Sequence, residues 1–260
     1  MDIKDSLREF YDANAEKYYY TRNKHRADAE IFLEEIKNSE KKTVHILEFG
    51  CGSGRLLAYL LSLKGITIHY TWVDISKNLL AFAKKQLTNK TTTKHIKATF
   101  ICDDIAHYLR WPKQESFDFV IGVASFQHIP TSKERFFIMK SIYRILQYDG
   151  KLIMTNRSFS LRFLKKYQQD FLRSLGKYII SLGKHQWNDL MIPRQDGKTT
   201  HKRFYHIYTL TELKKIASLS GFVIKQLGYL NKWVLTHTWK HSQNSLIIAQ
   251  KSIFLQNTPN

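Results

Sequence analysis

The chain has 260 residues, enough for one domain with a sizeable core and too few for two complete ones. Hydrophobic residues make up 43% of it, which argues against a disordered chain, and its two cysteines, Cys51 and Cys102, exclude a disulfide framework or a cysteine-held metal cluster. The formal net charge of +19 attracts polyanions such as nucleic acid, although a genome that favours lysine codons would also produce it. The segment Met1 to Ser6 lacks the apolar stretch of a secretion signal, and no window reaches the roughly 20 apolar residues of a membrane helix. We therefore expect a cytoplasmic protein with no bound metal and no membrane partner.

The predicted elements alternate between helix and strand. An N-terminal helical segment, residues 1–40, holds one helix near 3–21 and another near 26–37. Strands are predicted at 43–49, 66–73, 98–102, 117–123, 151–155, 222–229 and 245–253, with helices that begin near 55, 76, 132 and 209. This order is typical of an α/β, Rossmann-like doubly wound fold with a mostly parallel seven-stranded sheet, helices on both faces and a closing antiparallel hairpin.

Residues 159–202 interrupt that alternation. They are basic and aromatic, and they contain Gly176, Gly183 and Pro193. We interpret them as an insertion over the active site within a single domain, residues 1–260, and not as a second domain.

A glycine-rich loop follows the first predicted strand. It reads Glu48-Phe49-Gly50-Cys51-Gly52-Ser53-Gly54, and open α/β sheets bind ligands beyond the carboxyl ends of such strands. The dinucleotide fingerprint requires a small residue where this chain has Arg55, whereas S-adenosylmethionine (SAM) has no phosphate and fits better. We expect Glu48, Gly50, Cys51, Gly52 and Gly54 to bind SAM.

Acidic residues follow the next two strands. Asp74 lies about 20 residues beyond the loop, where a carboxylate can accept hydrogen bonds from ribose hydroxyls, and Ile75 follows it. The alternative for Asp74 is an acidic residue that only stabilises a helix N-terminus. In Asp103-Asp104-Ile105, one carboxylate is predicted near the adenine amino group, Asp104 before Asp103, and Ile105 against the ring.

The ordered motifs between Val44 and Thr155 resemble class I SAM-dependent methyltransferases. The resemblance places Val123, Ser125 and His128, after the fourth strand, at the cofactor. The segments that carry it are Glu48-x-Gly50-x-Gly52-x-Gly54, Asp74, Asp104, Phe117-Asp118-Phe119-Val120, Ser125-Phe126-Gln127-His128 and Leu146-Gln147-Tyr148-Asp149-Gly150.

Two acceptor classes are disfavoured, one by the residues after the fourth strand and one by the residues before the two cysteines. Methyltransferases of exocyclic base amines carry an Asn/Asp-Pro-Pro-aromatic signature there, whereas this chain has Val123-Ala124-Ser125-Phe126. Neither cysteine follows a proline, which argues against a cysteine nucleophile acting on a pyrimidine carbon.

A more particular resemblance covers segments from most of the chain. These are similar to the tRNA wobble-uridine carboxymethyl methyltransferases, which form the methyl ester of 5-carboxymethyluridine. The resemblance implies a tRNA anticodon loop as substrate and, in eukaryotes, a small zinc-binding activator protein as partner. Arg194 stands where that family usually has Trp, and Asn156 where it has an aromatic residue. The matching segments are Tyr11-x-x-x-Ala15-x-x-Tyr18-x-x-Thr21-Arg22, Ser125-x-x-His128-x-x-Thr131-x-x-Glu134-Arg135, Asp189-Leu190-Met191-Ile192-Pro193, Arg203-Phe204-Tyr205-His206-Ile207-Tyr208, Gly228-Tyr229 and Asn244.

A carboxylate acceptor needs cations and hydroxyl donors to orient it, and no strong base. Arg22, Arg203, His206 and Tyr205 are the candidate catalytic residues, and the basic, aromatic insertion suits RNA binding. Structural alternatives stay open, because Arg203 could pair with Asp189 and His206 could be a buried core histidine. Two other functions also stay open: a methyltransferase of a small carboxylic acid or quinone precursor, and a non-catalytic SAM-fold protein that binds RNA or a partner.

Overall fold

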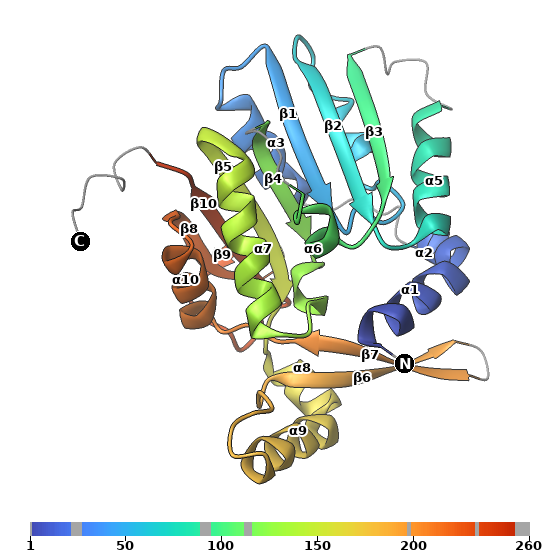
Figure 1. The fold of residues 1–260 in the computed structure, drawn as a ribbon, viewed down its shortest axis with the longest axis vertical. Coiled ribbons are helices and arrows are strands. Elements are labelled where there is room, and N and C mark those ends of the chain that lie inside the picture. Colours follow the sequence, from blue (N-terminus) through green and yellow to red (C-terminus); the bar gives the residue numbers. More distant parts are fainter. Residues whose placement is uncertain are drawn as a thin grey trace.

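A computed structural model describes residues 2–21, 28–88, 95–111, 116–196, 199–231 and 234–252. Its centre is one eight-stranded sheet in the order β3-β2-β1-β4-β5-β10-β8-β9, seen nearly face-on in Figure 1. The strands are β1 Thr43–Phe49, β2 Thr67–Asp74, β3 Ile96–Cys102, β4 Phe117–Val123, β5 Leu146–Arg157, β8 Val223–Asn231, β9 Val234–Thr236 and β10 Asn244–Gln250.

The sheet confirms the doubly wound α/β prediction, with one strand more than expected. Strands β3, β2, β1, β4 and β5 are parallel to one another, and β10 is antiparallel to both β5 and β8. The additional strand is β9, three residues that extend the β8 edge. Because β1 lies between β2 and β4, the strand order reverses there, and the carboxyl ends of β1 and β4 mark the switch point at which such sheets bind ligands.

Helices cover both faces of the sheet. One face packs on helices α3 Asp28–Lys37, α4 Leu57–Leu60 and α5 Lys77–Thr88, and the other on α6 Ile105–Tyr108, α7 Ser132–Ile145 and α10 Leu210–Leu219. The helix predicted from residue 55 is shorter than expected, because α4 keeps only four residues. None of the described helices is long and apolar enough to cross a membrane.

Two short helices, α1 Ile3–Ala13 and α2 Ala15–Thr21, lie against the carboxyl end of the sheet (Figure 1). Asp12 of α1 accepts hydrogen bonds from Ser76 Oγ at 2.6 Å and from the Asn78 N–H at 3.0 Å, which fixes α1 to the start of α5. The buried side chains Phe10 and Tyr18 pack with Leu79 of α5. The N-terminal segment is therefore part of the wall around the switch point.

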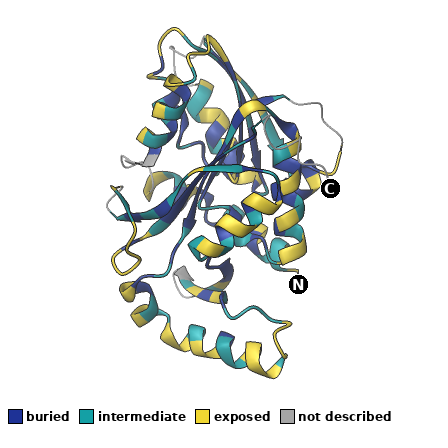
Figure 2. Ribbon diagram, turned by 90° about the vertical axis from the view of Figure 1, so that its left-hand side faces the viewer, coloured by how far each residue is buried: buried dark blue, intermediate teal, exposed yellow. Residues whose placement is uncertain are grey.

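The basic insertion forms two helices and a hairpin at the lower end of the molecule. These are α8 Leu161–Lys166, α9 Gln168–Ile180, β6 Asp189–Asp196 and β7 Thr199–His206, so the hairpin extends past the predicted end at residue 202. A small apolar core holds them together, made of Phe163, Leu190, Ile192, Tyr205 and Ile207. Figure 2 shows that the α9 side of this unit is mostly exposed, whereas β7 contacts α1.

Candidate functional site

The glycine loop turns sharply at the end of β1. Gly50 and Gly52 have φ angles of +62° and +58°, in the left-handed region that side chains other than glycine disfavour. A Cβ on Gly50 would lie 2.4 Å from Cβ of Ser125, whereas a Cβ on Gly52 would meet nothing within 4 Å. Gly50 is thus required by the close approach of the loop after β4, and Gly52 leaves open space where a ligand can contact the backbone.

These two glycines provide a matched pair of variants. We expect Gly50→Ala to lower the melting temperature strongly, because the backbone strain adds to the clash with Ser125. Gly52→Ala carries the backbone strain alone, roughly 1 kcal/mol, and we expect it to weaken binding of S-adenosylhomocysteine at least about tenfold. Thermal unfolding and calorimetry measure both effects. Unchanged affinity in Gly52→Ala would contradict ligand contact at this position.

Asp74, at the end of β2, faces the loop. Its carboxylate accepts hydrogen bonds from the Gly52 N–H at 2.7 Å and from the Ser76 N–H at 2.8 Å. Burial raises the pKa of Asp74 to about 6; the two N–H bonds lower it and the nearby charge of Asp12 raises it. Each carboxylate oxygen can accept a further hydrogen bond, so the side chain can bind ribose hydroxyls while it holds the loop.

This raised pKa predicts a pH dependence of cofactor affinity. Ribose hydroxyls donate to the ionised carboxylate, so affinity for S-adenosylhomocysteine should be constant above pH 6 and fall about tenfold per pH unit below it. Asp74→Asn binds more weakly and should show no such fall, because its amide does not titrate. Calorimetry between pH 5 and pH 8 provides the measurement, and parallel curves for the two proteins would contradict the assignment.

In Asp74→Ala we expect a loss of roughly 1.5–3 kcal/mol of binding free energy.

Asp103 and Asp104 lie on the opposite side of the same space. Oδ1 of Asp104 caps α6 by accepting from the Ala106 and His107 N–H groups, and it also accepts from Lys4 Nζ at 2.9 Å. Asp103 pairs with His107 Nδ1 at 2.7 Å. Both aspartates therefore stabilise the local fold as well, and the contact of Lys4 with Asp104 was not predicted.

Together these residues line a first cavity at the switch point. It contains most of the residues predicted to bind the cofactor, and α1 and α2 add Lys4, Leu7, Tyr11 and Tyr18, which the sequence did not single out as site residues. The lining residues are Lys4, Leu7, Tyr11, Tyr18, Phe49, Gly50, Cys51, Gly52, Ser53, Arg55, Val73, Asp74, Ile75, Leu79, Asp103, Asp104, Ile105, Val123, Ala124, Ser125, His128 and Ile129.

Two predicted cofactor residues lie outside this cavity lining. Glu48 is buried beneath the loop and accepts a hydrogen bond from the Tyr70 hydroxyl. Gly54 packs behind the loop, where a Cβ would be 3.1 Å from Ala83 and from Trp72. Both residues support the shape of the loop from behind, and the structure does not bring them to the cavity wall.

A second cavity adjoins the first and shares Tyr11, Ala124 and His128 with it. Three arginines from different elements line it: Arg157 from β5, Arg194 from β6 and Arg203 from β7. No acidic residue is among its lining residues, and within the described ranges no carboxylate pairs with these arginines. The remaining lining residues are Gln127, Phe163, Tyr167, Ile192, Tyr205 and Asn244.

Arg203 is the most buried of these cations, with 6% of its surface exposed. Its Nη1 donates to the hydroxyls of Tyr18 at 3.0 Å and Tyr11 at 3.4 Å, and the guanidinium lies 5.1 Å from the ring centre of Tyr205. Burial opposes its charge, but the surrounding tyrosines outweigh that effect and raise the pKa of Arg203. Its Nε is buried without a hydrogen-bond partner. Arg203 does not pair with Asp189, so that structural alternative is wrong.

Tyr11 and His128 connect the two cavities. His128 Nδ1 lies 2.8 Å from the Phe204 carbonyl and therefore donates to it, and His128 Nε2 lies 3.2 Å from the Tyr11 hydroxyl. A chain of hydrogen bonds thus runs from Arg203 through Tyr11 to His128. It fixes the orientation of the side chains that separate the two cavities.

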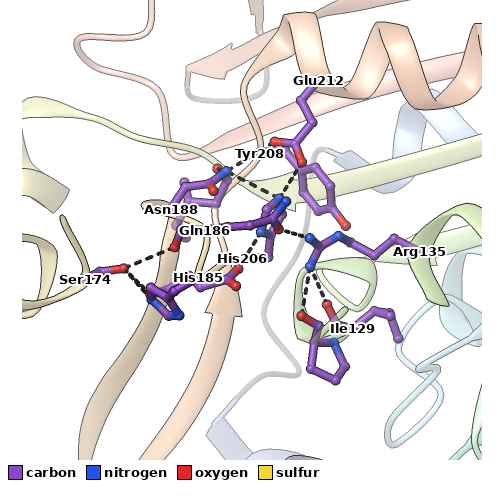
Figure 3. A network of polar contacts seen from close by, with 12 residues as sticks. Ile129, Arg135, Ser174, His185, Gln186, Asn188, His206, Tyr208 and Glu212 are labelled. Atoms are coloured by element: carbon purple, nitrogen blue, oxygen red, sulfur yellow. Dashed lines mark hydrogen bonds and ion pairs between the residues drawn. The ribbon is translucent and has the colours of Figure 1, made fainter. Parts of the chain in front are cut away.

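His206, predicted to be catalytic, lies away from both cavities. It is fully buried, with Nδ1 2.6 Å from Asp189 Oδ1 and Nε2 2.7 Å from Glu212 Oε1 (Figure 3). Both ring nitrogens thus lie within hydrogen-bond distance of a carboxylate. The same network includes Arg135 of α7, which donates to Gln186 and to the Ile129 carbonyl. His206 joins the insertion to α7 and α10, and the core-histidine alternative describes it correctly. The fourth catalytic candidate, Arg22, lies outside the described residues.

Solved structures share this fold. A SAM-dependent methyltransferase from Methanosarcina mazei superposes with a TM-score of 0.63 at 24% identity, over 84% of this chain and 97% of that one. A methyltransferase of Haloferax volcanii, solved in complex with the Trm112 methyltransferase activator, gives a TM-score of 0.63 at 14% identity, over 95% and 97%. The chain therefore has the fold of these methyltransferases.

The family comparison agrees. Residues 46–150 match the model of a family described as a methyltransferase domain. The malonyl-[acyl-carrier protein] O-methyltransferase of Bacillus cereus is 28% identical over 157 residues, 60% of this chain. The match spans 54% of that relative, about half its length. Residues 46–150 are thus similar to a methyltransferase domain, which supports SAM as the cofactor.

Proposed function

We propose that the protein transfers a methyl group from SAM to a carboxylate oxygen of its acceptor. The observation that carries the proposal is Arg203, a buried cation that no described carboxylate neutralises, in a cavity that shares a wall with the cofactor cavity. Burying such a charge without an anion is costly, and an anionic acceptor would remove that cost.

The chemistry asks little of the protein beyond positioning. When bound, SAM supplies a methyl group on a positively charged sulfur. A carboxylate is ionised at neutral pH, so its oxygen can form the new bond without a general base. Arg203 orients the acceptor, Tyr11 and His128 set its distance from the first cavity, and Tyr205 provides an aromatic surface for the attached group. The open space at Gly52 and the carboxylate of Asp74 fit the adenosyl part of the cofactor.

For the acceptor we propose the carboxylate of a 5-carboxymethyl wobble uridine in a tRNA anticodon loop. The second cavity can take a carboxymethyl base, since Arg203 and Arg157 can pair with the acid and Tyr205 can stack on the ring. Residues 1–260 would act as one domain in the cytoplasm, with the insertion, about 159–202, as an RNA-binding surface over the active site. Its described cations are Arg162, Lys165, Lys166, Arg173, Lys177, Lys184, Arg194 and Lys202; Lys198, the other predicted one, lies outside the described residues.

A nucleoside assay tests this acceptor. Bulk tRNA is incubated with the protein and labelled SAM, digested to nucleosides and analysed by mass spectrometry. We expect label in the methyl ester of 5-carboxymethyluridine. The absence of labelled nucleoside, under conditions where a small carboxylic acid is methylated, would refute the tRNA acceptor and retain the carboxylate chemistry.

A small-molecule acceptor is the second candidate, and one comparison favours it. The Bacillus cereus relative is an O-methyltransferase of malonyl-[acyl-carrier protein], and a malonyl group ends in a carboxylate. Both candidate acceptors place a carboxylate against Arg203, and they differ in the group that the carboxylate is attached to.

We also propose a small zinc-binding activator as a partner. Its support is the fold that this chain shares with a methyltransferase solved in complex with the Haloferax volcanii Trm112 methyltransferase activator. Co-expression of the two proteins, followed by gel filtration with multi-angle scattering, tests whether a one-to-one complex forms.

A further inference from the structure

A third cavity continues from the second toward the surface of the insertion. It shares Tyr167, Arg194 and Arg203 with the second cavity, and Lys165 and Lys166 of α8 line its outer part. The three cavities therefore follow one another from the cofactor to the surface. A ligand that places its carboxylate in the second cavity would extend into the third.

The start of helix α9 forms one side of this third cavity. Gln168, Gln169 and Asp170, the first turn of α9, all line it, and no side chain caps the helix at Tyr167. The first N–H groups of a helix have no partner within the helix, and together with the helix dipole they attract anions. A 13-residue helix that begins uncapped in a cavity is therefore suited to hold a phosphate.

The side chains around this helix start are mostly cationic. Lys165, Lys166, Arg194 and Arg203 line the cavity, and Asp170 is the single acidic lining residue. Oδ1 of Asp170 lies 3.5 Å from Arg173, a residue outside the cavity lining, so its charge is partly balanced there. The lining thus carries a net positive charge.

An independent observation comes from the buried end of the cavity. Arg203 lines both the second and the third cavity, is 6% exposed, and keeps a buried Nε without a hydrogen-bond partner. A buried polar group without a hydrogen-bond partner raises the free energy of the folded chain. An anion that reaches the guanidinium from either cavity would lower that free energy.

We propose that the N-terminus of α9, with Lys165, Lys166, Arg194 and Arg203, forms a phosphate-binding site. It holds a phosphate group of the acceptor one cavity away from the carboxylate that is methylated, a role that rests on the proposed function. The site selects acceptors that carry both a carboxylate and a phosphate, and it disfavours simple carboxylic acids.

The first test measures phosphate binding without catalysis. Inorganic phosphate is titrated into the full chain by calorimetry at constant ionic strength. The double variant Lys165→Gln/Lys166→Gln should bind it at least about tenfold more weakly, and Lys215→Gln, an exposed cation of α10 outside the cavity lining, should bind like the unmodified chain. Equal affinities in all three proteins, or no measurable binding to the unmodified chain, would overturn the site.

The second test asks whether the phosphate belongs to the acceptor. Methylation is compared for the 5-carboxymethyluridine nucleoside and for a short RNA that contains it. The double variant should raise the KM for the RNA more than the KM for the nucleoside, and Lys215→Gln should leave both unchanged. An equal change for the two acceptors would overturn the acceptor role. If phosphate binds as expected and neither acceptor is methylated, the tRNA proposal fails while the phosphate site remains.

Discussion

Arg203→Gln is expected to lower kcat/KM for a carboxylate acceptor roughly a hundredfold and to leave the affinity for S-adenosylhomocysteine unchanged. The variant loses charge-assisted hydrogen bonds to the acceptor, each stronger than a neutral one, from a guanidinium that is 6% exposed. The cofactor affinity is retained because Arg203 lines the second and third cavities and is not among the residues that line the first. Steady-state kinetics with a carboxylate acceptor, together with calorimetry for the cofactor, separate the two effects.

Two further variants complete this experiment. Arg203→Lys keeps the charge and loses the planar pair of donors. Its kcat/KM should therefore lie between that of the unmodified protein and that of Arg203→Gln. Arg162→Gln removes an exposed cation of the insertion that lines none of the three cavities, and we expect normal turnover of a small acceptor. If Arg203→Gln turns over as fast as the unmodified protein, the carboxylate assignment is wrong.

His206→Ala is expected to lower the free energy of unfolding by about 3 kcal/mol, with little change in cofactor affinity. It leaves the carboxylates of Asp189 and Glu212 beside a buried cavity without the imidazole that both contact, and losing one partner of a buried pair costs about 3–5 kcal/mol. The lower end of that range applies because the Glu212 side chain is 31% exposed. Urea unfolding at pH 7 measures the change.

The contacts of Glu212 also lead us to expect that stability depends on pH. Burial alone would raise the pKa of Glu212, but the hydrogen bond and charge of His206 outweigh it, and the pKa of Glu212 is lowered. Its contribution to stability is therefore present above its ordinary pKa of 4.5 and is lost as the pH falls further. The triple variant His206→Ala/Asp189→Asn/Glu212→Gln, with no ionised carboxylate left at this position, should recover part of the lost stability. If the His206→Ala variant is stable but inactive, the result would instead support a catalytic role for His206.

The sequence predicted the sheet better than it predicted the insertion. Strands β1 and β4 match their predicted ranges, because a buried strand with a turn after it has a pattern that local composition reveals. The strands of the β6–β7 hairpin were not predicted from the sequence. Its side chains partly contact α1 and α9 and partly line the cavities, so polar and apolar residues do not alternate regularly along it. The edge strand β9 has only three residues, too few for a periodic signal.

The residues of the candidate site likewise divide into those that the sequence predicted and those that it did not. Gly52 and Asp74 were predicted because one short segment carries their signal, and both line the first cavity. Lys4 and Tyr18 were missed as site residues because their role depends on where α1 and α2 pack, which is a tertiary property. His206 shows the converse: its residue type suggested chemistry, but its two carboxylate neighbours come from separate elements that the sequence alone does not bring together.

The wall shared by Tyr11, Ala124 and His128 has a consequence for inhibitor design. Because the first and second cavities adjoin at this wall, a single compound that links an adenosine to a short acid can occupy both of them. Binding of its first half would raise the effective concentration of the second, so such a conjugate should exceed either fragment in affinity by a wide margin. Lengthening the tether one atom at a time would then measure the separation that the methyl group has to cross.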